Sequence, residues 1–396
     1  MNKKINWKAM FLTAGAFVSF SIGSGFASGN ELLQFFGSWG SGAPIAVIAG
    51  LITTLLYCIC LYTVGANVSF EKSEETYLFF GGKILGRFFQ VFVAVLLVAT
   101  AMLMFSGAGS LLWQEFGLPQ WVGSIILGVI SVVVVLGGLK RVQNVLGFAG
   151  VGMLIYIAIF GIISLINPDS GLHQAENVGQ MVEDGQIYQA NMFTLPPFSW
   201  IPKLEDWNSP VLEGILYGTL CVTTGFPFYL SLGKRSKNTV EAVGSAVMTS
   251  VAFYGCIVLV LLLILTNFDA VLNPTTNEMY PFPAVSAIGV LWPAGRWTYV
   301  VLIFVGIFTT YTGFLWSINN IFFENREKTT KSRVFVALLT VFGICMGSVI
   351  PFSQFLNILQ PLSGVVGVIM VISIIVKTFS FVKARRNFGE VPSETQ

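Results

Sequence analysis

Residues 19–36, SFSIGSGFASGNELLQFF, contain the groups of this chain that are best suited to binding chemistry. Three glycines and three serines lie between Ser21 and Gly29, and Glu31 follows within a stretch that is otherwise apolar. Glycine costs about 1 kcal/mol relative to alanine inside a helix, and serine competes for backbone hydrogen bonds. Non-helical backbone survives at membrane depth only where protein buries it or where it lines a wet cavity. The segment is therefore predicted to be a broken membrane helix that forms a binding site.

Unwinding of this segment would free backbone groups that can bind an ionic solute. Helix ends leave several amides or carbonyls without intrahelical partners, and the macrodipole makes the N-terminal end of a helix positive. We expect a half-helix to begin near Ser28 and to face an anionic group such as a substrate carboxylate. The amides predicted to point at that group belong to Gly23, Ser24, Gly25 and Phe26.

A second apolar segment, residues 210–234, reads PVLEGILYGTLCVTTGFPFYLSLGK. Proline removes a backbone donor and clashes with the preceding turn, so this helix is predicted to open just before Pro227. Carbonyls released there would suit an ammonium group, and Phe226 either covers the ligand or simply packs. The predicted site residues of this segment are Cys221, Thr223, Thr224, Gly225 and Phe226.

The composition indicates a polytopic membrane protein. The 396 residues are 55% hydrophobic and 10% charged, with a mean hydropathy of +0.78, and no soluble fold would leave so much apolar surface unmatched by its solvent. The sequence shows no constellation of nucleophile, histidine and carboxylate and no histidine and cysteine cluster, so we expect neither an enzyme nor a cofactor. The net charge of +2 gives no reason to expect a nucleic-acid partner.

Apolar runs of about 20 residues mark helices that cross a bilayer, and the sequence contains ten such runs. With both termini inside, the cytoplasmic segments hold 19 of the 21 lysine and arginine residues, leaving Lys203 and Arg296 outside. We predict a multi-pass protein of the cell inner (cytoplasmic) membrane with both termini cytoplasmic. The predicted spans are residues 8–37 (broken), 42–68, 83–113, 119–138, 142–167, 209–232 (broken), 239–267, 296–324, 333–350 and 353–382.

The two predicted breaks lie about half the chain apart, and four further spans follow each of them. Five helices per half force the halves into opposite orientations, which is the pattern of inverted-repeat transporters. The alternative is that the glycines and serines only allow helices to pack closely. We predict an all-α fold with residues 1–167 as the first repeat, 168–208 as an extracellular loop, 209–382 as the second repeat and 383–396 as a cytoplasmic tail.

Two outer connections, residues 167–208 and 268–295, are long, polar and proline-containing. They precede the sixth and eighth spans, so they occupy comparable places. We expect both connections to cap the outer mouth of the bundle, and the first to contain a short surface helix.

Two overlapping motifs carry a resemblance to a known family. Residues 22–26, IGSGF, resemble the Gly-Ser-Gly signature in the first helix of the amino acid/polyamine/organocation (APC) superfamily, which has the LeuT-type 5+5 fold. Residues 23–31, GSGFASGNE, closely resemble the YkvI-like amino acid permease family, a branch of that superfamily. The resemblance implies a secondary transporter that holds its substrate between the first and sixth helices.

The resemblance also implies a sodium site between the first and eighth helices. In residues 306–320, GIFTTYTGFLWSINN, two threonines are adjacent. Hard oxygen ligands without formal charge suit a monovalent cation. The alternative is that threonine hydroxyls in a membrane helix bond back to the preceding turn. The implied ligands are the hydroxyls of Thr309 and Thr310 and the carbonyls of Gly306, Ser19 and Ile22.

Glu31 is the rival group for ion coupling, because an ionisable residue within a span is by default a functional candidate. Burial would favour its neutral form and let it carry a proton. By helix rise it lies about 9 Å from Gly25, so the alternative is that it reaches the outer vestibule, the substrate amine, a gate or Arg296. Glu213, at the outer start of the sixth helix, is expected to be solvated.

These features predict a secondary active transporter of a small amino acid or related zwitterion. We expect alternating access in the lipid bilayer with sodium as the coupling ion and no other cofactor. The alternatives are a proton-coupled or exchange permease that uses Glu31, and a membrane sensor that binds such a ligand without transporting it.

Overall fold

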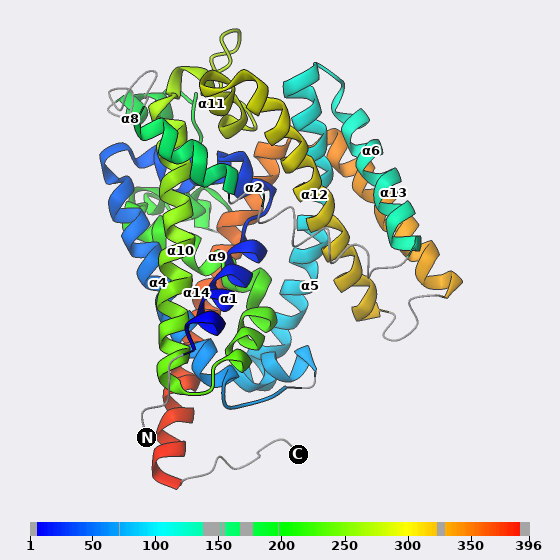
Figure 1. The fold of residues 1–396 in the computed structure, drawn as a ribbon. Coiled ribbons are helices and arrows are strands. Elements are labelled where there is room, and N and C mark those ends of the chain that lie inside the picture. Colours follow the sequence, from blue (N-terminus) through cyan, green and yellow to red (C-terminus); the bar gives the residue numbers. More distant parts are fainter. Residues whose placement is uncertain are drawn as a thin grey trace.

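Long apolar helices that run side by side form most of the molecule (Figure 1). The computed structural model describes residues 6–70, 72–137, 152, 155–166, 177–196, 198–322 and 329–388. Within these residues, seven helices are long and apolar enough to cross a membrane. The main helices of these segments are α4 (Ala43–Gly65), α5 (Ser73–Phe116), α9 (Pro210–Leu232), α10 (Thr239–Thr266), α12 (Pro293–Phe322), α13 (Thr330–Val349) and α14 (Phe352–Phe388).

The other three predicted spans correspond to shorter helices. The fourth is α6 (Gln120–Gly137), and the fifth is described as an apolar helix over Ile155–Ile166. Most of residues 142–154 in the predicted fifth span lie outside the described residues. The first span is divided into α1 (Trp7–Ser21), α2 (Ser24–Ser28) and α3 (Asn30–Phe35). The structure is thus almost wholly helical and compatible with ten spans.

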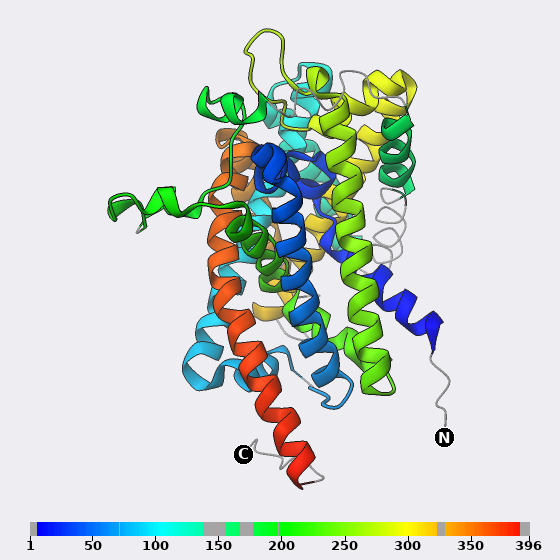
Figure 2. The ribbon, with the colours of Figure 1, turned by 90° about the vertical axis from the view of Figure 1, so that its left-hand side faces the viewer.

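The two ends of the described chain lie on the same side of the bundle. The start of α1 and the end of α14 are both at the lower end in Figures 1 and 2. α14 continues to Phe388, six residues beyond the end predicted for the last span, and its Arg385 side chain contacts the Asn67 side chain. In α5, Gly82 has a positive φ of 62° and kinks the helix where the predicted third span begins.

α9 lies against α4 and α14, and small residues let their backbones come close. A Cβ atom on Gly214 would collide with the carbonyl oxygen of Ala46, and one on Gly367 with that of Thr219. The Thr219 hydroxyl donates to the carbonyl of Gly364 at 2.8 Å. Close approach of this kind is how membrane helices gain packing contacts without a hydrophobic driving force. α9 is therefore firmly held along its outer half.

The two connections that were expected to cap the outer mouth both contact the first span. The amide of Ala190, in the first connection, donates to the Gln34 carbonyl at 3.1 Å. In the second connection, the Pro281 carbonyl accepts from the Asn30 side chain at 3.2 Å. The amide of Met279 donates to the Gln186 carbonyl at 3.2 Å and joins the two connections. They therefore form a hydrogen-bonded cover over α3.

Each outer connection also contains helix. The short helix predicted in the first is α8 (Val178–Glu183). The second connection was predicted only as a polar loop, but it contains the largely buried helix α11 (Pro283–Leu291). Pro283 occupies the first helical position, where its missing amide donor costs nothing, and Pro293 begins α12 in the same way. The proline content that indicated a loop thus marks two helix starts.

Candidate functional site

The first span is interrupted twice, which confirms the first predicted break. Ile22 and Gly23 have extended backbone conformations between α1 and α2. Gly29 has a φ of 79° and separates α2 from α3. Residues with a Cβ atom rarely adopt this conformation, and a Cβ atom here would also lie 3.3 Å from the Cβ of Ala284. Glycine at this position therefore permits both the turn and the close packing.

The first interruption frees backbone groups on both sides of the break. The amide of Gly23 donates to the Ser21 carbonyl at 3.1 Å, so it is not available as the helical partner of the Ser19 carbonyl. A helix does start near Ser28, because α3 begins at Asn30, but the sequence did not predict the short helix α2 that begins earlier, at Ser24. The first-turn amides of α2 include those of Gly25 and Phe26, and amides in that position have no preceding turn to bond to.

Glu31 folds back onto the broken segment. A Cβ atom on Gly25 would collide with the Oε2 atom of Glu31 and would lie 3.3 Å from the Nε2 atom of Gln360. Gln360 of α14 donates through Nε2 to Glu31 Oε2 at 2.5 Å, and the Tyr217 hydroxyl of α9 is within hydrogen-bonding reach. Glu31 is only 9% exposed. Three helices therefore place a carboxylate directly beside Gly25.

Two of the alternatives considered for Glu31, the outer vestibule and Arg296, can be compared with the structure. The turn at Gly29 redirects α3, so the straight helical rise that would bring Glu31 to the outer vestibule does not apply. Arg296 pairs with Glu115 at the end of α5, with a distance of 2.6 Å from Nε to Oε2. A pair between Glu31 and Arg296 is therefore not formed.

Further polar side chains surround α3, and the sequence reading did not include them in the site. Asn30 and Gln34 are fully buried, and the Gln34 amide donates to Asn30 Oδ1 at 2.6 Å. Asn30 in turn donates to Ser353 Oγ of α14 at 3.3 Å. The available signal was the run of Asn30, Glu31 and Gln34 in an apolar segment, where polar residues are costly unless they find partners. Nothing local indicated that those partners would come from α14.

The second predicted break is absent, and that prediction was wrong. α9 is helical from Pro210 to Leu232 and contains Pro227 in its interior. Its threonines bond back to the preceding turn, since Thr223 Oγ1 donates to the Leu220 carbonyl at 2.6 Å and Thr224 Oγ1 to the Cys221 carbonyl at 3.3 Å. Membrane helices tolerate proline where side chains and neighbouring helices compensate for the lost bond. α9 therefore does not offer the unwound backbone that was expected.

The residues around Pro227 serve mainly in packing. A Cβ atom on Gly225 would collide with the ring of Tyr229. The Phe226 ring contacts Tyr77 and Phe80 of α5, with centroid distances of 5.3 and 5.4 Å. Of the two readings of Phe226, the structure therefore shows packing against α5.

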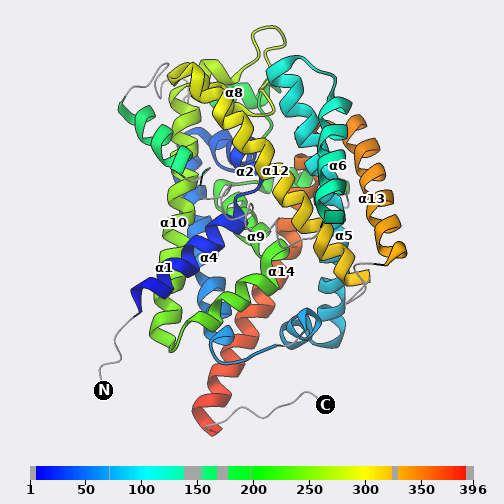
Figure 3. The same ribbon diagram turned by 45° about the vertical axis from the view of Figure 1, so that its right-hand side comes forward.

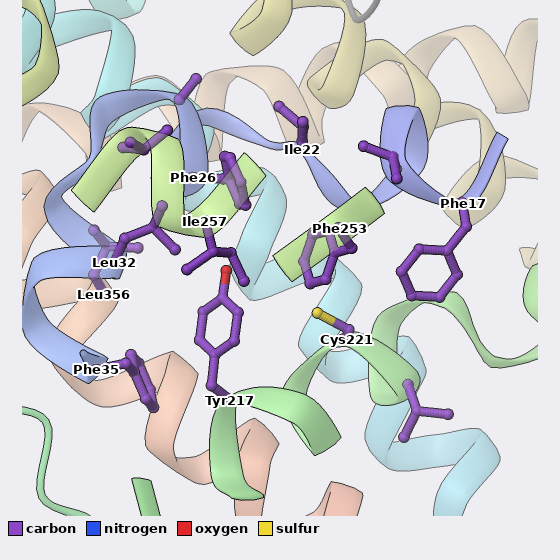
Figure 4. Packing of buried hydrophobic residues seen from close by; sticks show 14 of the residues in the cluster. Phe17, Ile22, Phe26, Leu32, Phe35, Tyr217, Cys221, Phe253, Ile257 and Leu356 are labelled. Atoms are coloured by element: carbon purple, nitrogen blue, oxygen red, sulfur yellow. The ribbon is translucent and has the colours of Figure 1, made fainter. Parts of the chain in front are cut away.

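α9 contributes side chains to the site from residues that lie nearer its N-terminus than Pro227. Tyr217 lies one turn before Cys221 on the same face, and Figure 4 shows its ring extending from α9 towards the first span, with the hydroxyl beside Ile257. Cys221 is buried and close enough to Glu31 for an electrostatic interaction. Phe26 contacts Phe253 of α10, with a centroid distance of 5.6 Å. The apolar residues in Figure 4 thus belong to one packed cluster that includes Tyr217 and Cys221.

The residues of the implied sodium site come from two segments, the end of α1 and the middle of α12. Thr309 is buried, and its hydroxyl donates to the Gly306 carbonyl at 2.9 Å, the back-bonding pattern given as the alternative. α12 contacts the first span at α2, where the Tyr299 hydroxyl donates to the Ala27 carbonyl at 2.7 Å. α1 instead packs against α10, which it crosses obliquely in Figure 3. A site formed by Ser19, Ile22, Gly306, Thr309 and Thr310 stays a prediction.

The solvent exposure of Glu213 differs from the prediction. It was expected to be solvated, but its exposure is 0% and neither carboxylate oxygen has a hydrogen-bond partner within the described residues. The reason is tertiary, because α4 and the first outer connection cover the outer start of α9.

Known proteins resemble this chain weakly in sequence and more clearly in fold. The uncharacterized membrane protein YkvI of Bacillus subtilis (strain 168) is 23% identical over 371 residues, covering 92% of this chain and 94% of YkvI. The uncharacterized protein YyaD of the same organism is 30% identical over 128 residues, covering 31% of this chain and 36% of YyaD. No protein-family profile matches the chain.

Among solved structures, the inward-facing conformation of Mhp1 matches with a TM-score of 0.60 at 14% identity and covers 95% of this chain and 77% of Mhp1. A closed conformation of Mhp1, described as a nucleobase-cation-symport-1 family transporter with bromovinylhydantoin bound, matches with a TM-score of 0.52 at 14% identity and covers 90% and 77% of the two chains. The fold is of the LeuT type. This chain is a membrane protein with that fold, and at this level of identity the match shows the fold alone.

Proposed function

We propose that the protein is a secondary active transporter of a small amino acid or related zwitterion that works by alternating access. The observation that carries this proposal is the Glu31 carboxylate beside Gly25, held by Gln360 from α14 and approached by Tyr217 from α9. The site combines an ionisable carboxyl with the free amides of a broken helix. The amides suit a substrate carboxylate, and the carboxyl can take either a proton or, when ionised, an ammonium group.

The position of Glu31 suggests how binding is coupled to a cation. A substrate carboxylate at the amides of Gly25 and Phe26 would meet the Glu31 carboxylate at close range, and two buried like charges repel. Protonation of Glu31 removes that repulsion, so proton and substrate would bind together. This route is favoured by the burial of Glu31 at 9% exposure.

Sodium coupling is the second candidate. Ser19 and Ile22 lie where the helical backbone ends, and their carbonyls are of the hard oxygen type that sodium prefers. Closure of α1 onto α12 would have to bring these carbonyls to Thr309, Thr310 and the carbonyl of Gly306. In that case the ion, and not Glu31, would supply the positive charge that offsets the substrate carboxylate.

The family and topology belong to the same proposal. We place the chain in the YkvI-like permease family of the APC superfamily, with residues 1–167 and 209–382 as inverted repeats and residues 168–208 outside the cell. Both termini would be cytoplasmic in the cell inner membrane, in agreement with the common side of α1 and α14 in Figure 1. We propose neither an enzymatic activity nor a nucleic-acid partner.

Uptake into proteoliposomes tests the function. Amino acids are offered under a pH gradient and, separately, under a sodium gradient, with Glu31→Gln and Thr309→Ala as variants. Proton-driven uptake that is lost in Glu31→Gln and kept in Thr309→Ala supports the Glu31 route, and the reverse pattern supports sodium. Binding without uptake under either gradient would contradict transport and indicate a sensor.

A further inference from the structure

The start of α9 has polar side chains at two positions that commonly pack against each other in helices. Ser209 is the N-cap residue, and its hydroxyl accepts from the Leu212 amide at 3.3 Å. Asn208 therefore occupies the position before the cap, and Glu213 the fourth helical position. Side chains at these two positions commonly pack against each other as an apolar pair that fixes how the chain enters the helix. Here the pair is an amide and a carboxyl.

Both side chains are left with buried oxygens that nothing satisfies. The Asn208 side chain donates through Nδ2 to the Ala190 carbonyl at 2.9 Å, which orients its Oδ1 atom away from that carbonyl. Asn208 Oδ1 and both oxygens of Glu213 are buried without a partner among the described residues. All three atoms are acceptors if Glu213 is ionised, so none can satisfy another. A buried acceptor without a donor is costly, and an isolated buried charge is costlier.

Within the described residues, no lysine or arginine forms an ion pair with Glu213, and Lys203 of the first outer connection is exposed. Tyr188 of the first outer connection interacts with it electrostatically, and Tyr217 follows one turn later on α9. α4 has no charged residue, and the first charged residue of α14 is Lys377, near the other end of that helix. Arg296 is engaged with Glu115. Tyr217 in turn interacts electrostatically with the carboxyl of Glu31.

We propose that Glu213 is a proton-binding site in which the carboxylic acid donates its proton to Asn208 Oδ1. One proton then satisfies two of the three orphaned oxygens and removes the buried charge. The site lies at the outer end of α9, and Tyr217 separates it from Glu31. A role as the outer proton donor for Glu31 rests on the proposed transport function, but the protonation of Glu213 does not.

Infrared spectroscopy of the full-length protein in lipid vesicles at neutral pH tests the proposal without transport. The wild type should show the carbonyl stretching band of a protonated, hydrogen-bonded carboxylic acid, and Glu213→Gln should lack it. Glu31→Gln is the matched control, because it removes a different buried carboxyl and should keep the Glu213 band. In Asn208→Ala the band should persist and move to higher frequency, because the acid loses its acceptor.

Several results would overturn the proposal. One is a Glu213→Gln spectrum that matches the wild type in the carboxylic acid region. Another is a carboxylate band of Glu213 that depends on sodium, which would make the site a metal-ion site. If Glu213→Gln does not fold, the Asn208→Ala spectrum alone decides, because an unchanged band rules out the proposed hydrogen bond. If the wild type shows no uptake but has the Glu213 band, the transport function is contradicted and the proton site is still supported.

Discussion

The first span changes direction twice between Ser21 and Asn30, whereas α9 runs from Pro210 to Leu232 without interruption. Both segments face the Glu31 carboxylate, and each supplies a different kind of group. The first span contributes backbone, through the extended residues Ile22 and Gly23 and the turn at Gly29. α9 contributes side chains from one face, including Tyr217 and Cys221.

The comparison shows that the glycine at position 29 interrupts its membrane helix, whereas the proline in α9 does not. Gly29 adopts a backbone conformation that a helix cannot contain, so the chain must turn there. Pro227 keeps a helical φ and only removes one donor, a loss that the packed surroundings of α9 absorb. Thr223 and Thr224 then bond within their own helix and are not turned to the site.

Gly25→Ala should have the largest effect, because it places an atom where the Glu31 carboxylate lies. Overpacking of this kind costs about 1–3 kcal/mol, which corresponds to a roughly 5- to 150-fold loss of uptake at low substrate concentration. Gly15→Ala is the matched control, since a Cβ atom there meets nothing within 4 Å. Equal uptake in the two variants would show that the space at Gly25 is not part of the site.

Gln360→Ala should have the next largest effect, because it removes the donor to Glu31 from α14. A hydrogen bond to a charged group contributes about 1.5–3 kcal/mol, so the thermal unfolding midpoint in lipid should fall. Gln354→Ala on the exposed side of the same helix should leave the midpoint unchanged. If the midpoints of both variants match the wild type, the Glu31–Gln360 contact does not stabilise the first span.

Pro227→Ala should have the smallest effect, because α9 is already helical through this position. Uptake should stay within about twofold of the wild type, and stability should be unchanged or slightly higher, since alanine restores a donor for the helix. A loss of uptake of about tenfold or more, with folding intact, would mean that α9 must open at Pro227 during transport. The contrast with the first span would then hold for only one state of the cycle.

The sequence alone determined the membrane class, the approximate positions of the spans and the interruption of the first span between Ser21 and Gly29. These features depend on local properties, namely the length of apolar runs and the cost of glycine and serine within a helix. The carboxylate of Glu31 was also recognisable as a functional candidate, because an ionisable group in an apolar segment needs a reason to be there.

Only the tertiary structure decided what Glu31 and Glu213 face and whether α9 stays wound. Glu31 meets Gln360, more than 300 residues away in the chain, because the turn at Gly29 and the packing of α14 bring them together. Glu213 is buried because α4 and the outer connection cover the start of α9. Contacts between distant segments select among backbone and side-chain positions that local preference leaves open, and no pattern within a single helix records that choice.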